Sequence, residues 1–177
     1  MSSFIKLQNL HFSYDNLSAE LIAGISVGFH HGWTSLCGPN GCGKTTLLKL
    51  ISGELKPNSG SIAAQGSIVA IPQSTEFAPS GLHGFRLDYQ KSAIKLRNHL
   101  KIGDDWYERW PSLSIGERKR LQIAVALASN PDVLLVDEPT NHVDAETKQV
   151  ILEALNNFRG VGVIISHDRL LLNELCS

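Results

Sequence analysis

Two short apolar segments, Val133–Val136 and Val161–Ile165, limit most strongly how this chain can fold. Such runs of four or five residues are typical of strands that are buried on both faces. Each segment follows a stretch with helical periodicity or a helix-length spacer, at about residues 115–129 and 145–157. Strands that alternate with helices of this length imply a parallel sheet with helices on its faces, which is an α/β fold.

The first third of the chain has a different pattern, which predicts a β subdomain. Apolar residues alternate with polar ones from Ile5 to Tyr14, with one slip that is typical of a β-bulge, and alternate again from Ile25 to Phe29. Further elements are then expected along the chain: a strand at 34–37, a helix at 44–52, and a hairpin that pairs 61–64 with 68–71.

The segment from about Thr75 to Pro111 has a different composition and is a candidate helical subdomain. Glycine and proline open it, and residues 91–101 then place Ala93, Leu96 and Leu100 on one helical face. With the following helix, to about residue 130, this segment would form an insert in a single domain that spans residues 1–177.

Composition excludes several classes of protein. The formal net charge of −1 gives no general case for binding nucleic acid or an anionic membrane. No apolar run reaches the roughly 20 residues that a membrane span needs, and no secretory signal opens the chain. Three cysteines without a CxxC pair suggest neither a disulfide framework nor a zinc site, so we expect a cytoplasmic protein.

The segment "GPNGCGKTT" matches the pattern G-x-x-x-x-G-K-[ST], with a predicted strand before it and a predicted helix after it. Glycines let successive backbone N–H groups turn inward around phosphate oxygens. Lys44 would add a positive charge for the β- and γ-phosphates, and the Thr45 hydroxyl would bind Mg²⁺. The alternative is a plain glycine-rich turn, which the flanking elements disfavour. The predicted phosphate loop comprises Gly38, Pro39, Asn40, Gly41, Cys42, Gly43, Lys44, Thr45 and Thr46.

An acidic pair, Asp137 and Glu138, follows the first apolar strand. The carboxyl ends of parallel strands are where such sheets bind ligands, so the pair is expected beside the phosphate loop. Asp137 could hold Mg²⁺ directly or through water, and Glu138 could accept a proton from an attacking water. An acidic pair that merely ends a strand before a proline turn is the alternative.

Two further polar residues also end predicted strands. His167 follows the strand at 161–165, and Gln73 follows the strand at 68–71. Taken alone, a structural histidine and a surface glutamine remain the simpler interpretations.

Five segments in order, "GPNGCGKTT", "IPQ", "LSIGE", "LLVDEPTNHVD" and "ISHD", resemble the ATP-binding-cassette (ABC) ATPases over about Phe4 to Asp168. The resemblance implies a P-loop NTPase core of the ABC type, an N-terminal antiparallel β subdomain and a small inserted helical subdomain. It also implies binding and hydrolysis of ATP with Mg²⁺.

The resemblance assigns roles within one cassette. Tyr14 resembles the aromatic residue that stacks on adenine, with Phe12 the weaker candidate. Gln73 resembles the residue that contacts Mg²⁺ and the attacking water, so the implied metal ligands are Thr45, Gln73 and Asp137. His167 resembles the histidine that contacts the γ-phosphate, and with Glu138, Gln73 and Lys44 it completes the implied catalytic set.

Other residues would act on a second cassette. Ser114 and Gly116 resemble residues that contact the γ-phosphate of an ATP held by a partner. Asp144 resembles the D-loop aspartate of the family, a nucleotide-site residue. A second ABC domain, in a homodimer or in trans, is therefore an implied partner. The chain has Ile115 where the family usually has glycine. Ser114 and Glu117 also have the spacing of a helix capping box.

Three biological roles follow from the resemblance. "EPTNHVD", "SHDR" and the short insert resemble the ABC-F group, soluble twin-cassette ATPases of which many act on the ribosome. The alternatives are the motor subunit of a transporter, which would bind a transmembrane permease, and an interaction module that does not hydrolyse ATP. The family usually continues beyond the histidine, whereas this chain ends at Ser177, which suggests a fragment or a shortened cassette.

A basic run mildly favours the ribosome through RNA phosphate contacts. The solvated face of a helix is the simpler interpretation of this run. Its members are Arg86, Lys91, Lys95, Arg97 and Lys101, against only Asp88.

Overall fold

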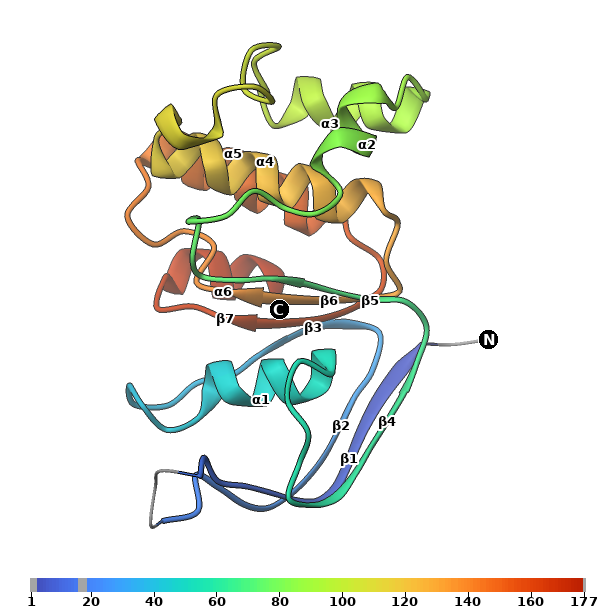
Figure 1. Ribbon diagram of the computed structural model, residues 1–177, viewed down its shortest axis with the longest axis vertical. Coiled ribbons are helices and arrows are strands. Elements are labelled where there is room, and N and C mark those ends of the chain that lie inside the picture. The colour runs from blue at the N-terminus through green and yellow to red at the C-terminus, as the bar shows by residue number, and fades with distance from the viewer. Residues whose placement is uncertain (1–2, 16–18, 177) are drawn as a thin grey trace.

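The computed structural model describes residues 3–15 and 19–176, and its centre is a four-stranded parallel sheet (Figure 1). The strand order is β3-β7-β6-β5, and each neighbouring pair runs in parallel. The predicted α/β fold is confirmed. The strands are β3 (Gly32–Ser35), β5 (Ile68–Ile71), β6 (Val133–Asp137) and β7 (Val161–Ile165).

The two inner strands are buried on both faces, as their apolar sequences predict. On β6, Leu134 and Val136 pack into the core beneath α4 and α5, whereas Val133 and Leu135 pack into the core around α1. The period-two alternation of a strand thus supplies two cores from one apolar run. The helices are α1 (Lys44–Ser52), α4 (Ile115–Ala128), α5 (Ala145–Asn156) and α6 (Arg169–Leu175).

A three-stranded antiparallel sheet lies on the other side of α1, so this helix is covered by a sheet on each side (Figure 1). It consists of β1 (Phe4–Phe12), β2 (Ile22–Phe29) and β4 (Ser59–Gln65), in the order β2-β1-β4. The predicted slip in β1 is observed as register shifts against both neighbours. The antiparallel subdomain predicted at the N-terminus is therefore present.

The hairpin expected between 61–64 and 68–71 is wrong. β4 pairs with β1, whereas β5 joins the parallel sheet beside β6. The chain changes sheets at Gly66, which has a φ of 107°, and the next residue is held by Asp132, whose carboxylate accepts from the Ser67 backbone N–H at 2.8 Å. The continuous apolar sequence of β5 suits a partly buried parallel strand, and the small polar residues of β4 suit a more exposed one.

Smaller differences concern element ends. β3 covers Gly32–Ser35 instead of 34–37, although the Leu36 N–H still donates to the Ile164 carbonyl at 2.8 Å. The helix predicted at 91–101 ends at His99, and a short helix at Leu82–Leu87 was not predicted.

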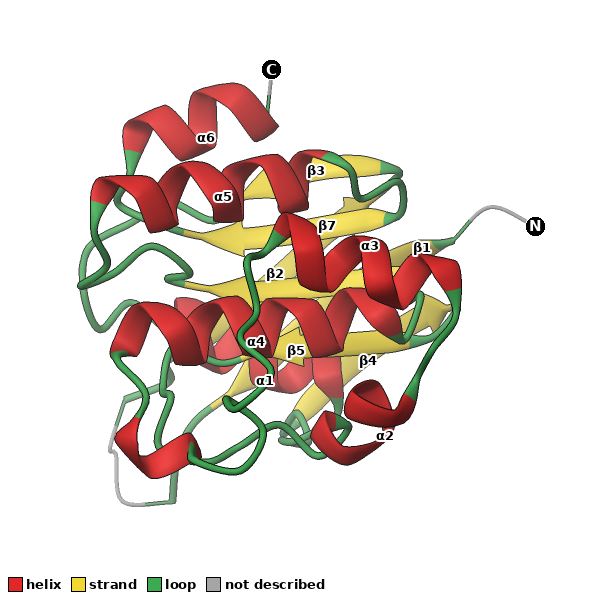
Figure 2. Cartoon of the chain, turned by 90° about the horizontal axis from the view of Figure 1, so that it is seen from above, coloured by secondary structure: helices red, strands yellow, loops and turns green. Residues whose placement is uncertain are grey.

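The segment between β5 and α4 lies over α4 on the side away from the sheet (Figure 2). It contains α2 (Leu82–Leu87), α3 (Lys91–His99) and a 3₁₀ turn, η1 (Trp110–Ser112). Ala93, Leu100 and Trp106 are buried in the same core as α4.

Contacts within the chain engage most of the basic run in this segment. Arg86 pairs with Glu108 at 2.6 Å, and Lys101 pairs with Glu146 at 2.5 Å. The Arg97 guanidinium donates to the carbonyls at the end of α2 and lies over the Phe85 ring. These contacts favour the solvated-helix interpretation of the run over an RNA-binding surface.

In the described part of the chain, no helix combines the length and the apolar character that crossing a membrane requires.

Candidate functional site

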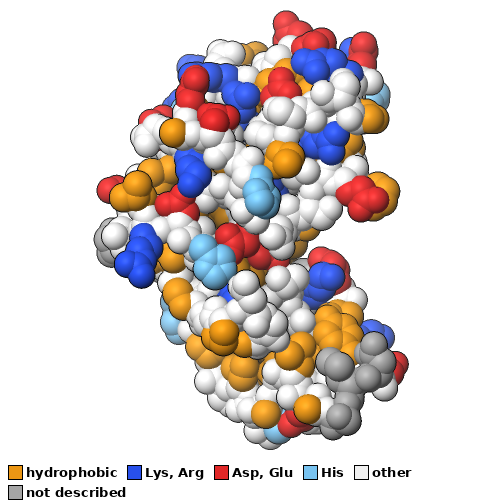
Figure 3. Space-filling model, turned by 90° about the vertical axis from the view of Figure 1, so that its left-hand side faces the viewer, with side chains coloured by type: hydrophobic (Ala, Val, Ile, Leu, Met, Phe, Trp, Pro, Cys, Tyr) orange, Lys and Arg blue, Asp and Glu red, His pale blue; other side chains and the backbone are white. Residues whose placement is uncertain are grey.

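A cavity of about 480 Å³ opens at the carboxyl edge of the parallel sheet. Residues far apart in sequence meet there: the phosphate loop, Gln73 after β5, the acidic pair at the end of β6, and His167 after β7. Figure 3 looks onto this side of the molecule, where acidic and histidine side chains lie close together near its centre. Parallel strands bring these residues together because their carboxyl ends share one edge.

The phosphate loop joins β3 to α1, and its backbone requires glycine. Gly41 and Gly43 have φ angles of 81° and 95°, which side-chain-bearing residues rarely adopt. Gly43 is also the N-cap of α1 and supplies no side-chain hydrogen bond to the helix. The first N–H groups of α1 are therefore available for an anion, which is the property that makes helix N-termini bind phosphate.

The Lys44 ammonium group lies across this loop. It donates to the carbonyl oxygens of Gly38 and Pro39 at 2.8 and 2.9 Å. These bonds hold a positive charge at the mouth of the loop and also fix the loop's first residues.

Thr45 and Asp137 come together in the floor of the cavity. The Thr45 hydroxyl donates to Asp137 Oδ2 at 2.7 Å, and Asp137 is only 4% exposed. A hydroxyl beside a carboxylate offers the hard oxygen ligands that Mg²⁺ prefers, so the residues present fit this ion. Across the described ranges, no group of three or more His, Cys, Asp or Glu residues could hold a metal. Further ligands for a Mg²⁺ ion here would come from Gln73, which lines the same cavity, and from a phosphate group or water.

Glu138 faces His167 across the cavity. Its Oε1 lies 3.4 Å from His167 Nε2, and its Oε2 accepts from the His167 backbone N–H at 3.4 Å. Glu138 has a left-handed φ of 45°, while its own N–H donates to the Ile165 carbonyl at 2.8 Å. This turn at the end of β6 points the carboxylate of Glu138 into the cavity, where its side chain is 12% exposed.

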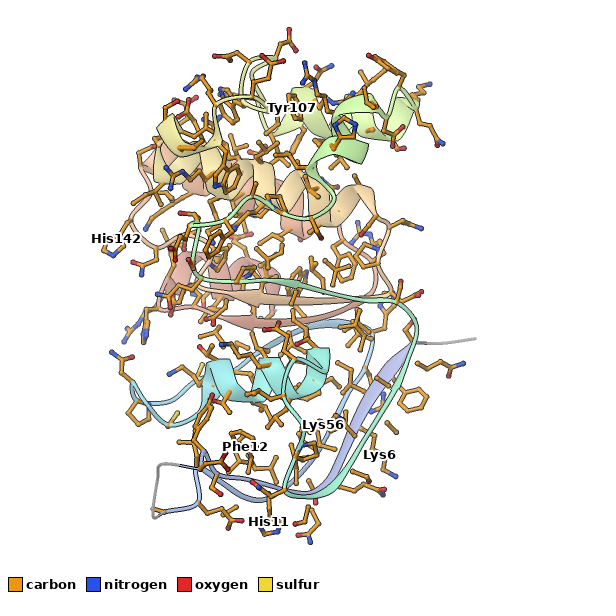
Figure 4. All side chains as sticks on the ribbon, viewed as in Figure 1. Lys6, His11, Phe12, Lys56, Tyr107 and His142 are labelled. Carbon is orange, nitrogen blue, oxygen red and sulfur yellow. The ribbon has the colours of Figure 1, made fainter. Side chains whose placement is uncertain are left out.

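Two residues at the cavity's boundary were not predicted, and a third residue lies next to one of them. Leu21 and Asn141 line the cavity, and sequence analysis missed both. Asn141 lies within the "EPTNHVD" segment, which was a signal for it, whereas nothing in the sequence marked Leu21. His142 follows Asn141 with a φ of 58°, and its side chain projects away from the fold (Figure 4).

Tyr14 lies close to α1 but is not among the residues that line the cavity. Its hydroxyl is 3.1 Å from Thr46 Oγ1, and its ring meets that of Phe12 edge-on, with centroids 4.9 Å apart. Phe12 is buried beneath α1 (Figure 4). Of the two aromatic candidates, Tyr14 is therefore the more accessible.

Ser114, Gly116 and Asp144 lie outside the cavity. Ser114 caps α4 through the predicted capping box, since its hydroxyl accepts from the Glu117 N–H and Glu117 accepts from the Ser114 N–H. Burial opposes ionisation of Glu117, but the two hydrogen bonds with Ser114 and the Arg109 charge outweigh it and lower the pKa of that carboxyl.

Asp144 caps the neighbouring helix α5. Its carboxylate accepts from the backbone N–H and the hydroxyl of Thr147, both at 2.8 Å, and these bonds lower its pKa. Gly116 fits against this cap, because a Cβ at Gly116 would lie 3.3 Å from Thr147 Oγ1. The N-termini of α4 and α5 therefore pack closely at Gly116.

Comparison with known proteins gives consistent matches. The family model described as "ABC transporter" matches residues 22–141, more than half of the chain. "Probable ATP-binding protein YheS" of Escherichia coli K12 is 38% identical over 175 residues, covering 90% of this chain and 26% of the relative. "Energy-dependent translational throttle protein EttA" of the same organism is 34% identical over 195 residues, covering 98% and 34%. The chain thus spans about a quarter to a third of the length of these relatives.

A solved structure agrees with the fold. It is the dimeric, post-hydrolysis state of the ATP-binding cassette MJ0796 bound to ADP and Pi, with a TM-score of 0.80 and 22% identity over 97% of this chain and 91% of that one. The fold, the motif-bearing cavity and the family model agree, and the chain therefore belongs to the ABC transporter family as an ATP-binding cassette.

Proposed function

We propose that this cassette binds ATP with Mg²⁺ in the cavity at the sheet edge and hydrolyses the γ-phosphate. One observation carries the proposal: a phosphate loop, a hydroxyl–carboxylate pair and a glutamate–histidine pair line a single cavity. Each group has a distinct use in phosphoryl transfer to water, and no simpler function of the cavity needs all of them.

The phosphate loop from Gly38 to Thr46 would hold the nucleotide's phosphates. The N–H groups of the loop and of the first turn of α1 would donate to phosphate oxygens. Lys44 would exchange its carbonyl partners for the β- and γ-phosphates. Tyr14, on the flank of α1, would stack on the adenine ring.

The chemical step would be an in-line attack of water on the γ-phosphate. Glu138 would accept the proton of that water, and its carboxylate is held on one side by His167. His167 would donate to the γ-phosphate, and Gln73 would orient the water. Mg²⁺ bound by Thr45, Asp137 and Gln73 would neutralise charge on the phosphate oxygens.

We further propose that two cassettes close around ATP. Ser114 and Ile115 are exposed and do not line the chain's own cavity, and Gly116 and Asp144 lie beside them. An exposed helix N-terminus with a free approach is suited to an anion that another molecule holds. The partner is a second ABC domain, in a homodimer or in trans.

For the biological role we propose an ABC-F-type ATPase that acts on the ribosome in the cytoplasm. EttA, a relative over nearly the whole chain, is named for an energy-dependent effect on translation, which takes place on the ribosome. The alternative is the motor subunit of a transporter, because the family is named for transporters. In that case a transmembrane permease would be the partner.

The test of the proposed activity is the ATPase rate as a function of protein concentration. If two cassettes must meet, the rate rises quadratically at low concentration. Glu138→Gln should keep ATP binding, lose most turnover and accumulate an ATP-bound dimer. Hydrolysis at the wild-type rate by this variant would show that Glu138 is not the catalytic base. A rate that rises strictly linearly with protein concentration would refute the pairing of two cassettes.

The biological role needs a different measurement. Glu138→Gln protein, trapped with ATP, is used as bait in a cell extract, with Lys44→Ala as the control that binds nucleotide weakly. Ribosomal RNA and ribosomal proteins retained only with the trapped form would support the ribosome. A hydrophobic permease in their place would support the transporter.

A further inference from the structure

The backbone that carries Gln73 is held by side chains at an unusual density. From Pro72 to Glu76, each of five consecutive carbonyl oxygens accepts a hydrogen bond from a side chain of α4 or of the 3₁₀ turn before it. Lys119 Nζ donates to Pro72 and Gln73 at 2.8 and 3.1 Å, and Gln122 Nε2 donates to Ser74 at 2.9 Å. Arg118 Nη1 donates to Thr75 and Trp110 Nε1 donates to Glu76, both at 3.3 Å.

Lys119, one of these donors, is buried, which is unfavourable for a charged side chain. Lys119 is 1% exposed, whereas lysine is almost never fully buried unless its ammonium group is paired. Burial lowers the pKa of Lys119 to about 8, although the nearby charge of Asp137 opposes this shift. A methionine would fill the same space without a buried charge, but it could not donate to the Pro72 and Gln73 carbonyls, so these two hydrogen bonds are what a lysine provides here.

What Lys119 does contact is the segment that enters the cavity. Its partners are the backbone carbonyl oxygens of Pro72 and Gln73, and Gln73 also lines the cavity. The carbonyls are fixed from below by α4, so the side chain of Gln73 is free to act on the cavity side. Because both carbonyls bind the same ammonium group, the position and the orientation of this backbone segment relative to α4 are fixed.

The same helix is capped by Ser114. Lys119 lies five residues further along α4, or about 7.5 Å along the helix axis at 1.5 Å per residue. The donor that holds the Gln73 backbone therefore lies within two turns of the exposed N-terminus of α4. Arg118 and Gln122 attach the flanking carbonyls to the same two turns of the helix.

We propose that Lys119 is a positioning residue that fixes Gln73 at the nucleotide cavity by binding its backbone. This inference rests on the proposed hydrolysis of ATP in that cavity. Gln73 lines the cavity and Lys119 does not, so Lys119 would act through Gln73. Gln122 supports the same backbone from the next turn.

A double-mutant cycle tests whether Lys119 acts through Gln73. Lys119→Met removes the donors and keeps the length of the side chain, and Lys119→Arg restores donors. We expect Lys119→Met to lower kcat at least about tenfold while KM for ATP changes less than about twofold, with partial rescue by Lys119→Arg. In a Gln73→Ala background the same change should cost less than about twofold. Lys95→Met, on the exposed face of α3, is the matched control and should have no effect.

Additive losses in the cycle would overturn the inference, because they would show that Lys119 acts independently of Gln73. If Lys119→Met does not fold, Gln122→Met gives the same cycle without removing a charge. A smaller loss of kcat is expected for it, again absent in the Gln73→Ala background.

A readout without hydrolysis separates this inference from the proposed function. A protease that cuts after glutamate should cleave after Glu76 several-fold faster in Lys119→Met than in wild type, while cleavage after the exposed Glu20 stays unchanged. Equal cleavage after Glu76 in both proteins would refute the holding role of Lys119. Wild-type protein that hydrolyses no ATP but shows this difference in cleavage would refute the proposed function and leave the positioning of the segment standing.

Discussion

Replacing Thr45 with valine isolates one hydrogen bond in the floor of the cavity. Valine has nearly the shape of threonine, so the change removes the hydroxyl that donates to Asp137 Oδ2 at 2.7 Å and little else. Hydrogen bonds to charged groups contribute about 1.5–3 kcal/mol, and Asp137 is 4% exposed. Because the cavity admits water, which can replace part of the lost bond, we expect Thr45→Val to lower the free energy of unfolding by about 1.5 kcal/mol, the lower end of that range.

Thr46→Val is the matched control, since it makes the same chemical change at the next residue. The Thr46 hydroxyl is 3.1 Å from the Tyr14 hydroxyl, a bond between neutral groups. Such bonds contribute about 0.5–1.5 kcal/mol, so the loss of stability should be similar or smaller. Only Thr45 faces the carboxylate, so only Thr45→Val should affect binding of Mg²⁺.

The assay combines urea unfolding with calorimetric titration of ATP, in Mg²⁺ and in EDTA. Wild type and Thr46→Val should bind ATP more tightly in Mg²⁺ than in EDTA. Thr45→Val should lose most of this difference while retaining binding in EDTA. If Thr45→Val responds to Mg²⁺ as wild type does, the hydroxyl–carboxylate pair is not the metal site, and the argument from its geometry fails.

Three further changes test the helix N-termini. Ile115, 46% exposed beside Ser114, should hinder closure of two cassettes, so Ile115→Gly should tighten ATP-driven dimerisation in ultracentrifugation; no change would mean that the isoleucine is accommodated. Gly116→Ala adds a Cβ that would meet Thr147 Oγ1 at 3.3 Å, so in urea unfolding it should be about 1 kcal/mol less favourable than the same change in a Thr147→Ala background; equal effects in both would refute the close contact. Because the pKa of Asp144 is lowered from its ordinary value of 3.8, its carboxylate stabilises the folded state above about pH 4, and this stability is lost as pH falls through the folded-state pKa. Asp144→Asn should therefore flatten the decline of the melting temperature below about pH 4. An unchanged decline would contradict this.

The parallel core was predictable because its strands are apolar runs between helices. Val133–Val136 and Val161–Ile165 are buried throughout, and that burial is visible in the sequence as the absence of polar positions. The change of sheet at Gly66 was not predictable from local pattern. Two strand-like segments with a glycine between them favour a hairpin locally, and the pairing of β4 with β1 and β5 with β6 is decided by distant partners.

The residues of the cavity were predictable where they belong to motifs. Thr45, Asp137 and Glu138 follow from the phosphate loop and a strand end, whereas His167 was implied only by the family resemblance, and all four line the cavity. Leu21 has no such signal, because its place depends on how the antiparallel sheet meets α1. The role of Lys119 was not predictable for a similar reason. A lysine in a helix with several charges is expected at the surface, and only packing against Pro72 and Gln73 buries it.

The strand order of the parallel sheet has a consequence for how the protein is made. β3, which leads into the phosphate loop, pairs with β7, and Gly32 lies opposite Val161. During synthesis the loop therefore emerges long before the strand that supports it. A ligand stabilises a protein only to the extent that it binds the folded state, so ATP can promote folding only after residues near His167 have left the exit tunnel. Before that point β3 lacks its partner β7, and an unpaired strand edge of this kind is prone to association with other chains.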